Sequence, residues 1–499
     1  MSRNIKIKKG VDIKLKGTAR RVVAGKISSN TYAIKPTDFH GLTPKLAIKQ
    51  GDEVKAGSTL FYDKYNEAIK FASPVSGEVV EIVRGDRRKV LEIKILADSE
   101  MKYEDFGAAE PTSLSADEVK SKMLAGGVWP LVKQRPYDVV ADPNQQPKAI
   151  HITAFNSAPL EPDFDFILAG EEEAFQAGLN ALNQLAEGKV FLNIPYKKNV
   201  HFDADEEIQF VDKTGETKSV TYNVAEKQPD WQPARKVLEQ EIAKREKPSA
   251  MFTEAKNVKI NAFDGPHPAG NVGIQIHHIS PINKGEKYWT LNAQGVVLIG
   301  RLFLTGKFDA RKIVALAGPK VKSPQHYEVI VGASIESLSS NVDDSAPVRY
   351  ISGNVLTGTQ IDKAGYLGFY DNLVTVLEEG YAPDLFGWAV PFQPEKFSIS
   401  RTLFSWLNPD KEYSLNTNMN GEPRAFVVTG EYEKVFPMNI YPVQLAKACI
   451  TQDIEMLESL GIYEVAPEDF ALCEFACTSK TPVQSIIREG LDLVKKECE

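Results

Sequence analysis

Histidines and cysteines gather at two places in the chain where a metal ion or an iron–sulfur cluster could bind. The stretch Phe263–His278, "FDGPHPAGNVGIQIHH", holds three histidines, three glycines and two prolines. His277 and His278 are adjacent, so on a strand they would point to opposite faces and would not easily share one ion. Cys473 and Cys477 have the spacing of one helical face, but a cluster needs about four ligands. We therefore expect no metal site, and expect Phe263–His278 to be a rigid turn leading into a strand.

A covalently bound cofactor is the second chemistry that residue spacing suggests. The stretch "DKYNEAIKFASPVSGEV", preceded by "GDEVKAGSTLFY", resembles half of a lipoyl or biotinyl domain, in which a hairpin-tip lysine is modified. Counting back from Pro74 places the tip at Asn66, whereas the nearest lysines, Lys64 and Lys70, are displaced by two and four residues. A shift of two keeps Lys64 on the same face but off the tip. Asparagine suits a turn because it tolerates left-handed geometry. We expect a carrier-like β-domain that carries no group.

A nucleotide site would need a glycine-rich loop whose amides cradle phosphates. The best candidate is "MLAGGVWPLVKQRPYD", in which Gly126 and Gly127 are followed by Val128, Trp129 and Pro130. The bulky side chains fill the space that a phosphate needs, and proline lacks an amide donor. No GxGxxG or Walker pattern is present elsewhere. The sequence therefore disfavours a bound flavin or NADH.

Aromatic and basic residues cluster directly after this loop. Trp129, Lys133, Arg135 and Tyr137 allow two interpretations, a core tryptophan with solvated flanks or a surface that meets a quinone head or a partner protein. Together with Phe39, these four residues are our candidates for a quinone-proximal or partner-proximal site. We identify no catalytic residue, because the chain shows no Ser-His-Asp order, paired-carboxylate motif or zinc signature.

Composition excludes several classes of protein. The 499 residues are 42% hydrophobic and 25% charged, which suits three or four globular domains. A net charge of −8 argues against a nucleic-acid binder. We find no apolar run long enough for a membrane helix and no signal-peptide pattern at the N-terminus, and four cysteines fit a reducing cytosol. Residues 1–26 hold nine lysines or arginines, which favours an edge strand or a surface facing an acidic partner or anionic lipid.

Periodicity predicts a multidomain α+β chain. Residues 1–100 alternate with period two and form a small sandwich or barrel; residues 101–260 contain the strand–helix–strand unit of a parallel sheet, with a charged insert at about 197–256. Mixed α/β structure follows in 261–345, a β-rich extension in 346–395 and helices in 396–499. The sequence of the insert predicts a hairpin and an exposed helix.

Helix signals are strongest at four places. A helix follows "PTSLS" and stops at Gly126, and another contains Phe175, Leu179, Leu182 and Leu185 and stops at Gly188. A third begins at Pro442 and stops at Gly461, and the last has Thr481 as N-cap.

Long ordered motifs resemble one family over nearly the whole chain. They include "GDEVKAGSTLFYDK", "FDGPHPAGNVG", "GRLFLTGKFDARKIVALAGPKV", "YLGFYDNLVTVLEEG" and "PEDFALCEFACTSK". The chain is similar to the NqrA family of the bacterial sodium-translocating NADH:quinone oxidoreductases. Relatives of that family in respiratory complex I and the Rnf complexes use a glycine-rich loop for flavin, and "GGVWPLVKQ" stands in its place here.

The resemblance implies a lipoyl/biotinyl-like β-domain, a Rossmann-like α/β domain, a β-grasp (SLBB-like) domain and a C-terminal helical domain. It implies a peripheral subunit on the cytoplasmic side of the bacterial inner membrane, inactive alone, in a six-subunit pump that couples NADH oxidation and quinone reduction to sodium export. The partners would be membrane and flavoprotein subunits, most directly NqrB, and ubiquinone or menaquinone. NADH, FAD, FMN, iron–sulfur clusters and quinone would be bound by other subunits, and no cofactor by this chain.

Two departures from the family pattern and three alternatives stay open. The insert is longer than expected, and "SPQHYEVIVGAS" lacks the arginine expected near Gln325 or His326. The alternatives are a flavin- and NADH-binding component of a dehydrogenase, a lipoyl or biotin carrier, and a scaffold protein that binds ligands through its middle domain.

Overall fold

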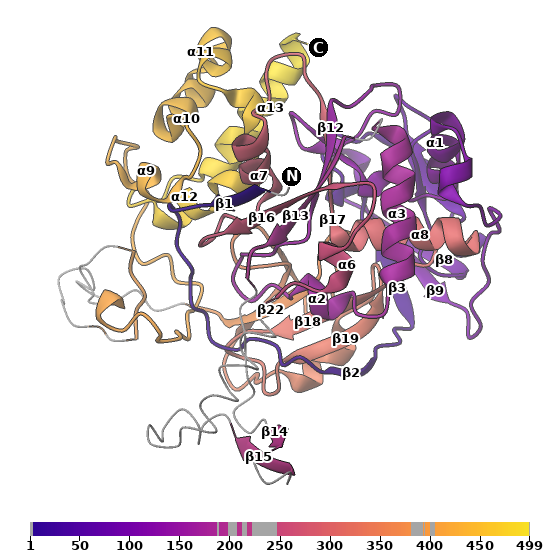
Figure 1. Cartoon of the computed structure of the whole chain (residues 1–499), viewed down its shortest axis with the longest axis horizontal. Helices are drawn as coiled ribbons and strands as arrows, with labels where there is room; N and C mark the ends of the chain where they lie inside the picture. The colour runs from indigo at the N-terminus through magenta and orange to yellow at the C-terminus, as the bar shows by residue number, and fades with distance from the viewer. Residues whose placement is uncertain are drawn as a thin grey trace.

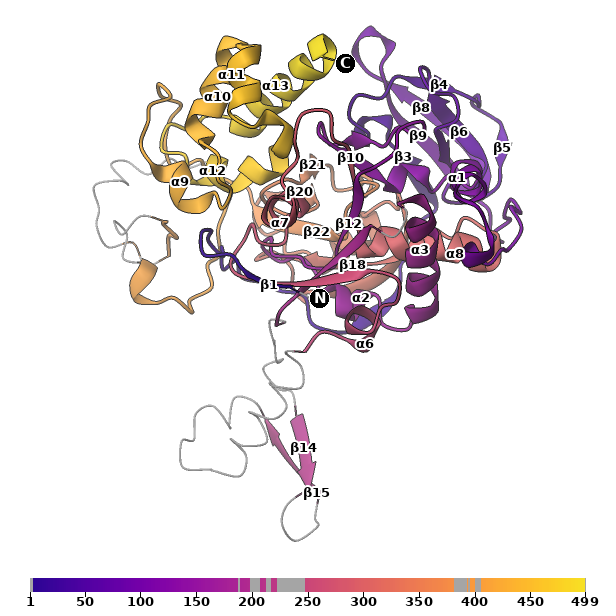
Figure 2. The same ribbon diagram turned by 45° about the horizontal axis from the view of Figure 1, so that its top comes forward.

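The computed structural model describes residues 3–186, 189–197, 207–211, 217–221, 247–380, 393, 395–399 and 405–498. A central α/β region lies between the C-terminal helices on one side and the N-terminal β-domain on the other (Figures 1 and 2). A second large sheet lies beneath the central one. Within the described residues, no helix is both long and apolar enough to cross a membrane.

The central sheet has seven strands, of which the first five in spatial order run parallel. In that order they are β1 (Arg3–Lys6), β16 (Lys259–Asp264), β13 (Val190–Pro195), β12 (Ala149–Thr153), β17 (Tyr288–Asn292), β10 (Lys133–Arg135) and β11 (Val139–Val140). The last two pair antiparallel. The parallel pairing of β12 with β13 confirms the predicted strand–helix–strand unit.

The path of the chain through this sheet defines where a ligand can bind. From β12 the chain moves outward through β13 to β16, and then returns to place β17 on the other side of β12. The sheet therefore reverses its strand order between β12 and β17. In open α/β sheets, ligands bind outside the carboxyl ends of the strands at such a switch point.

The helices of the α/β region are α1 (Ala116–Ala125), α2 (Phe164–Ile167), α3 (Glu172–Leu185), α6 (Ala250–Thr253), α7 (Val272–Ile279) and α8 (Ala293–Thr305). The predicted α1 is confirmed, and Ser115 and Glu118 form its capping box. Phe175, Leu179, Leu182 and Leu185 of α3 are buried, as predicted. The predicted stop at Gly188 lies outside the described residues.

The second large sheet has six strands. In spatial order they are β2 (Val23–Lys26), β19 (Gln325–Ile330), β18 (Arg311–Ala317), β22 (Leu373–Glu378), β20 (Val348–Ser352) and β21 (Thr359–Ile361). Two predicted boundaries are therefore wrong. The boundary at 260 falls inside β16, so residues up to Thr305 complete the α/β region. The predicted extension 346–395 supplies β20 to β22 of the same sheet as β18 and β19, because strand pairing joins segments that the sequence separates.

The N-terminal β-domain contains β3 (Thr31–Ile34), β4 (Pro44–Leu46), β5 (Glu53–Val54), β6 (Thr59–Asp63), β7 (Lys70–Ala72), β8 (Gly77–Arg84) and β9 (Val90–Ala97). The basic segment before this domain forms edge strands, as one of its two interpretations predicted. β1 forms one edge of the seven-stranded sheet and β2 one edge of the six-stranded sheet. Lysines on such edges discourage pairing with another chain.

The hairpin between β6 and β7 differs from expectation at its tip. Asn66 does not adopt the left-handed conformation predicted for it. Its main-chain N–H instead donates to Asp63 O at 3.2 Å, and its side chain donates to Asp142 Oδ1 at 3.4 Å. The asparagine therefore closes the turn and fastens it to the neighbouring α/β region. Lys64 and Lys70 are exposed beside it.

The C-terminal part contains α9 (Glu431–Val435), α10 (Pro442–Thr451), α11 (Ile454–Ser459), α12 (Ala471–Ala476) and α13 (Val483–Cys498). The single helix predicted from Pro442 to Gly461 is wrong, because Gln452 adopts the left-handed conformation and Asp453 caps α11. The last predicted helix is present and begins just after Pro482.

Short 3-10 helices and one hairpin complete the described chain. The 3-10 helices are η1 (Pro36–Asp38), η2 (Asp86–Arg88), η3 (Pro111–Ser113), η4 (Trp129–Leu131), η5 (Glu336–Asn341), η7 (Ser405–Leu407), η8 (Ile462–Glu464) and η9 (Pro467–Phe470). β14 (Glu207–Val211) and β15 (Thr217–Thr221) form the antiparallel hairpin predicted in the insert, and both views show it projecting from the body (Figures 1 and 2). The exposed helix predicted in the insert falls on residues outside the described ones.

Candidate functional site: a polar cavity at the switch point

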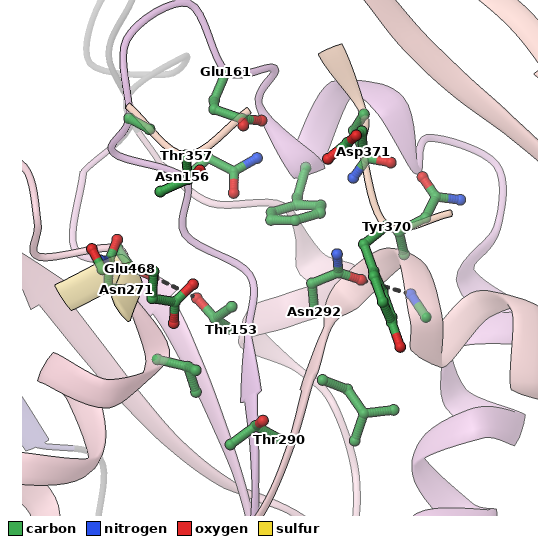
Figure 3. Close-up of a pocket in the computed structure, with 18 of the residues that line it drawn as sticks. Thr153, Asn156, Glu161, Asn271, Thr290, Asn292, Thr357, Tyr370, Asp371 and Glu468 are labelled. Atoms are coloured by element: carbon green, nitrogen blue, oxygen red, sulfur yellow. Dashed lines mark hydrogen bonds between the residues drawn. The ribbon is translucent and has the colours of Figure 1, made fainter. Parts of the chain in front are cut away.

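A cavity of about 250 Å³ lies at the carboxyl ends of β12 and β17. Thr153 and Asn156 contribute from the end of β12 and the loop after it, and Thr290 and Asn292 contribute from β17. Figure 3 shows Tyr370 facing Thr153, Asn156 and Asn271 across this space. The cavity therefore occupies the position that the strand order favours for a ligand.

Three separate parts of the chain complete its walls. The loop before α7 supplies His267, Gly270 and Asn271; the six-stranded sheet and its loops supply Lys312, Asn354, Thr357, Phe369, Tyr370 and Asp371; the C-terminal part supplies Glu468. The "FDGPHPAGNVG" stretch thus contributes to the cavity wall. The prediction that a strand follows it is wrong. Val272–Ile279 is helix α7, whose His277 and His278 bond Glu464 Oε2 at 2.7 Å and Pro437 O at 2.9 Å.

Glu161 is one of four acidic residues that line the cavity, with Asp138, Asp371 and Glu468. Its Oε1 accepts a hydrogen bond from Asn354 Nδ2 at 3.1 Å. Asn354 is itself held, because its Oδ1 accepts from the main-chain N–H groups of Leu356 and Thr357. Burial raises the pKa of Glu161 to about 7, with a further contribution from the charge of Asp371. The carboxyl group is thus fixed in place and close to half ionised at neutral pH.

Lys312 is a buried base that also lines the cavity. Its Nζ donates to the main-chain oxygens of Phe369 at 3.2 Å and Asp371 at 2.5 Å. Burial lowers the pKa of Lys312 to about 8, although the carboxylates of Asp371, Asp38 and Glu161 oppose the shift. The lysine therefore holds the 369–371 loop in place.

Two buried side chains on the walls keep polar atoms without a partner in the described chain. They are Gln294 Oε1 and His267 Nε2, on residues that are 4% and 3% exposed. Burial lowers the pKa of His267 to about 4, so its ring is neutral at pH 7. Its Nδ1 bonds Ser157 Oγ at 3.1 Å. Such unsatisfied groups are uncommon in folded proteins, and these two atoms are available to bond a ligand or water in the cavity.

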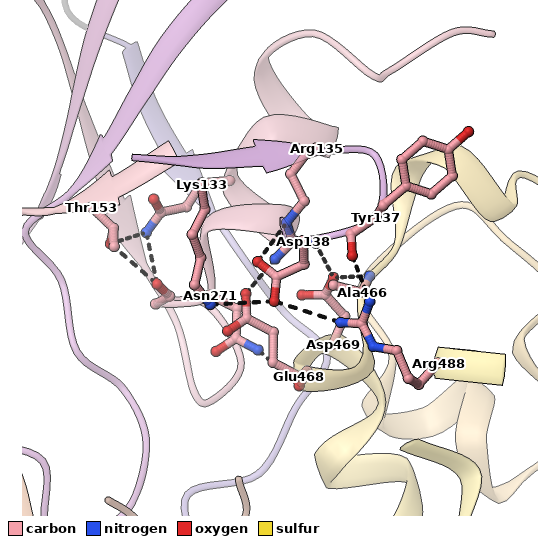
Figure 4. A network of polar contacts seen from close by, with 12 residues as sticks. Lys133, Arg135, Tyr137, Asp138, Thr153, Asn271, Ala466, Glu468, Asp469 and Arg488 are labelled. Atoms are coloured by element: carbon pink, nitrogen blue, oxygen red, sulfur yellow. Dashed lines mark hydrogen bonds and ion pairs between the residues drawn. The ribbon is translucent and has the colours of Figure 1, made fainter. Parts of the chain in front are cut away.

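Beside the cavity lies a buried charge network centred on Arg135, which we call the Arg135 cluster: Lys133, Arg135, Asp138, Glu468, Asp469 and Arg488 (Figure 4). Arg135 donates to Asp469 Oδ2 at 3.1 Å and to Glu468. Asp138 lies 3.4 Å from Lys133 Nζ and 3.8 Å from Arg488 Nη2. The network joins β10 to η9 and α13, and so fastens the C-terminal helices to the central sheet.

The pKa shifts in the cluster follow from this pairing. Burial alone would lower the pKa of Arg135, but Asp469, Glu468 and Asp138 together raise it above its usual value. Burial would raise the pKa of Asp138, and the three cations around it hold that pKa well below its usual range. Burial raises the pKa of Glu468 to about 7 despite the attraction of Arg135. Arg135 is therefore fully ionised, and its charge is met by carboxylates of the same chain.

The structure separates the five predicted candidates. Trp129 is buried, donates its indole N–H to Ala141 O at 2.8 Å and meets Trp289 edge-on at 5.3 Å. Trp129 is therefore a core residue, as the first interpretation predicted. The solvated flanks that the same interpretation predicted are wrong for Arg135 and Tyr137. Arg135 and Tyr137 are buried too, because the C-terminal helices cover them.

Phe39 and Lys133 do reach the cavity region. The ring of Phe39 lies 5.0 Å from that of Phe369 and 5.8 Å from that of Tyr370. Lys133 Nζ lies 4.6 Å from the centre of the Tyr370 ring. Both residues also line a smaller neighbouring cavity of about 160 Å³.

The loop at Gly126 and Gly127 is filled by its surroundings. A Cβ on Gly127 would lie 2.4 Å from Ala72 Cβ, and one on Gly126 would lie 2.4 Å from Leu302 Cδ2. Trp129, Pro130 and Leu131 behind the loop are buried. The backbone at this point packs against protein on both sides.

Among the described residues, no three of the histidines, cysteines and acidic residues are placed to hold a metal ion. Cys473 and Cys477 are buried and unbridged. Cys473 lies in α12, and Cys477 is the residue that caps the C-terminus of the same helix.

Together the fold is that of a multidomain α+β protein with an N-terminal β-domain and two sheet domains that enclose a polar cavity. Three family descriptions match it in order: the NqrA N-terminal barrel-sandwich hybrid domain at residues 5–98, the NqrA second alpha/beta domain at 114–221 and 233–308, and the NQRA C-terminal domain (SLBB) at 313–363. The chain belongs to the NqrA family, whose curated members are named as one component of the Na(+)-translocating NADH-quinone reductase.

Curated relatives agree over the full length. The NqrA protein of the Na(+)-translocating NADH-quinone reductase of Serratia proteamaculans is 34% identical, and that of Vibrio alginolyticus is 32% identical; each alignment covers 99% of this chain and 100% of the relative. Among solved structures, an NAD+-reducing [NiFe]-hydrogenase in the air-oxidized state aligns with 76% of this chain and 63% of its own at 12% identity. Its TM-score is 0.35, too low to establish a shared fold.

Proposed function

We propose that this chain is a peripheral component of a sodium-translocating NADH:quinone oxidoreductase, docked on the cytoplasmic side of the bacterial inner membrane. The observation that carries the proposal is the end-to-end alignment with relatives that are named for that enzyme. In this role it binds the membrane and flavoprotein subunits, most directly NqrB. It contributes to assembly of the complex and to interaction with ubiquinone or menaquinone.

The packing of the glycine loop supports a chain that holds no flavin of its own. A phosphate-binding loop needs open space above its amides, and Ala72 and Leu302 occupy the space around Gly126 and Gly127. The Rossmann-like α/β domain then acts as a scaffold, and NADH, FAD, FMN and the iron–sulfur cluster are bound by other subunits.

Two surface features support docking. Of the fourteen exposed large hydrophobic side chains among the described residues, nine lie in residues 405–498, including the adjacent pairs Trp406–Leu407 and Val427–Val428. Exposed apolar side chains favour a protein interface where they form a contiguous patch. The basic edge strands β1 and β2 add charge suited to an acidic partner or lipid surface. The quinone-proximal role is best placed at Phe39 and Lys133, which line cavities.

The test is purification from native membranes through an affinity tag on this chain, followed by mass spectrometry of the intact chain and of the proteins that accompany it. We expect an unmodified chain together with hydrophobic membrane subunits and flavoproteins, and no NADH oxidation by the chain alone. Recovery of the chain by itself would contradict the docking role. Added mass on Lys64 or Lys70 would instead support a carrier, and bound flavin would support a dehydrogenase component.

A further inference from the structure

We propose that the cavity at the switch point binds a small, neutral, ring-shaped molecule through a vicinal diol, of the kind presented by a ribose or a monosaccharide. The proposal concerns a ligand of this chain itself and does not depend on the proposed function. It rests on the size of the cavity, on the orientation of the amides in its walls, and on the balance of charge around it.

The size of the cavity limits the ligand. At about 250 Å³ it is slightly smaller than the roughly 300–1,000 Å³ of typical small-molecule sites. A single sugar ring, alone or with one attached base, suits this volume, whereas a dinucleotide does not. Phe155, Phe164, Phe369 and Tyr370 contribute aromatic surface to the walls, and an aromatic face packs well against the apolar face of a ring.

Three asparagines in the walls are oriented by the main chain. Asn156 Nδ2 donates to Pro162 O at 2.8 Å, and Asn271 Nδ2 donates to Glu468 O at 3.1 Å, which leaves their Oδ1 atoms as acceptors. Asn292 is held the other way, because its Oδ1 accepts from the N–H of Gly295 at 2.8 Å and caps α8. Its amide NH2 is then the donor left for a ligand.

The walls therefore offer fixed acceptors and a fixed donor together. The acceptors are Asn156 Oδ1, Asn271 Oδ1 and the Glu161 carboxylate, and the donor is the amide of Asn292. A hydroxyl group both donates and accepts, so a pair of hydroxyls can satisfy this wall. An ammonium group only donates and would leave Asn292 unpaired. A carboxylate beside a diol is also the arrangement that nucleotide-binding α/β folds use for a ribose.

The charges around the cavity disfavour a phosphate. Glu161 and Asp371 are carboxylates on the wall, and the two lysines that line the cavity are already engaged. Lys312 donates to two main-chain oxygens, and Lys133 is paired with Asp138. A phosphorylated ligand would thus meet carboxylates without an unengaged lysine on the described wall, which is unfavourable in a partly buried site.

The experiment is isothermal titration calorimetry of the purified full chain with adenosine, 2′-deoxyadenosine, D-ribose, D-glucose and adenosine monophosphate. We expect a diol-bearing neutral probe to bind, and adenosine monophosphate and 2′-deoxyadenosine to bind about tenfold or more weakly than adenosine. Binding of adenosine but not of the sugars identifies a nucleoside, and binding of a free sugar at equal strength identifies a sugar. Equal binding of adenosine and 2′-deoxyadenosine, or no binding of any probe up to about 10 mM, would overturn the proposal.

Variants tie the binding to this cavity. Glu161→Gln keeps the shape of the side chain and removes its charge, and we expect it to weaken binding about tenfold. Thr290→Val is nearly isosteric on a cavity-lining strand and should weaken binding several-fold. The matched control is Glu336→Gln, an exposed residue of η5 that is not among the cavity walls, which should leave binding unchanged. Unfolding temperatures of all three confirm that each variant is folded. Unchanged binding in both cavity variants would place the ligand elsewhere and overturn the proposal.

Discussion

The Arg135 cluster and the neighbouring cavity are both rich in buried polar groups, and they share Lys133, Asp138 and Glu468. They differ in how those groups are satisfied. In the cluster each charge faces an opposite charge within the chain. In the cavity, amide and carboxylate atoms are oriented by one bond and left open at the other. Buried polarity alone therefore does not mark a binding site; the cavity differs because its oriented polar atoms line open space.

The largest effect that we expect comes from disrupting the Arg135 cluster. Arg135→Met removes the cation between Asp469, Glu468 and Asp138, and leaves buried carboxylates facing one another. Removing one partner of a buried ion pair costs about 3–5 kcal/mol. We expect the free energy of unfolding, measured by urea denaturation, to fall by that amount.

The control for Arg135→Met is Arg424→Met, since Arg424 is exposed and its main-chain N–H, rather than its side chain, makes the contact to Ser479. We expect a change within about 0.5 kcal/mol there. Comparable losses of unfolding free energy in the two variants would mean that the cluster does not fasten the C-terminal helices. The contrast between a satisfied cluster and an open cavity would then not hold.

A smaller effect tests the packed glycine loop. Gly127 and Gly107 have nearly the same φ, +71° and +70°, but a Cβ would meet Ala72 Cβ at 2.4 Å at Gly127 and nothing within 4 Å at Gly107. Gly107→Ala should therefore cost only the strain of a left-handed alanine, about 1 kcal/mol. Gly127→Ala should cost about 1–3 kcal/mol more, because it also overpacks the interface.

Urea denaturation of the two glycine variants side by side isolates the packing effect from the strain. Equal losses would show that the loop has room to move away from the N-terminal β-domain. In that case the argument that no phosphate fits above Gly126 and Gly127 would also fail.

Local patterns in the sequence were enough to predict much of the fold. Ser115 and Glu118 predicted the start of α1, and the spacing of Phe175, Leu179 and Leu182 predicted α3. Local patterns failed where distant residues decide the outcome. The segment Val272–Ile279 alternates like a strand, yet its two histidines contact the C-terminal part and stabilise a helix there.

The candidate site was harder to predict than the fold, since its parts are far apart in the chain. The sequence left two interpretations open for Arg135, a solvated flank or a surface site, because its partners, Glu468 and Asp469, lie more than 300 residues away.

Of the residues that line the cavity, only Lys133 was among the predicted candidates, and Glu161, Asn292 and Gln294 are examples of those that the sequence analysis missed. The usable signal was polar residues directly after buried strands, as in "HITAFNSAPLEPD", but only the strand order places Thr153 beside Asn292. Long-range pairing of this kind leaves no trace in local periodicity.

The smallest expected effect concerns the cavity, and it is the pH dependence of the stability of the Glu161→Gln variant. Burial raises the pKa of Glu161 from its ordinary value of 4.5 to about 7. Its protonated form is therefore favoured in the folded state, so its contribution to stability is fully present below pH 4.5 and is lost as the pH rises through 7. Glutamine does not titrate. Between about pH 5 and about pH 8 the variant should gain about 2–3 kcal/mol of stability relative to the parent chain.

Urea denaturation at both pH values measures this gain, with Glu336→Gln as the exposed control that should track the parent chain. Because the carboxyl group of Glu161 loses its solvation when the cavity is closed from water, the gain also reports how well the walls exclude solvent. A variant that follows the parent at both pH values would mean that Glu161 ionises as it does in water. The cavity would then be an open surface, and a ligand diol would have to compete with bulk solvent for the same carboxylate instead of completing a prepared set of partners.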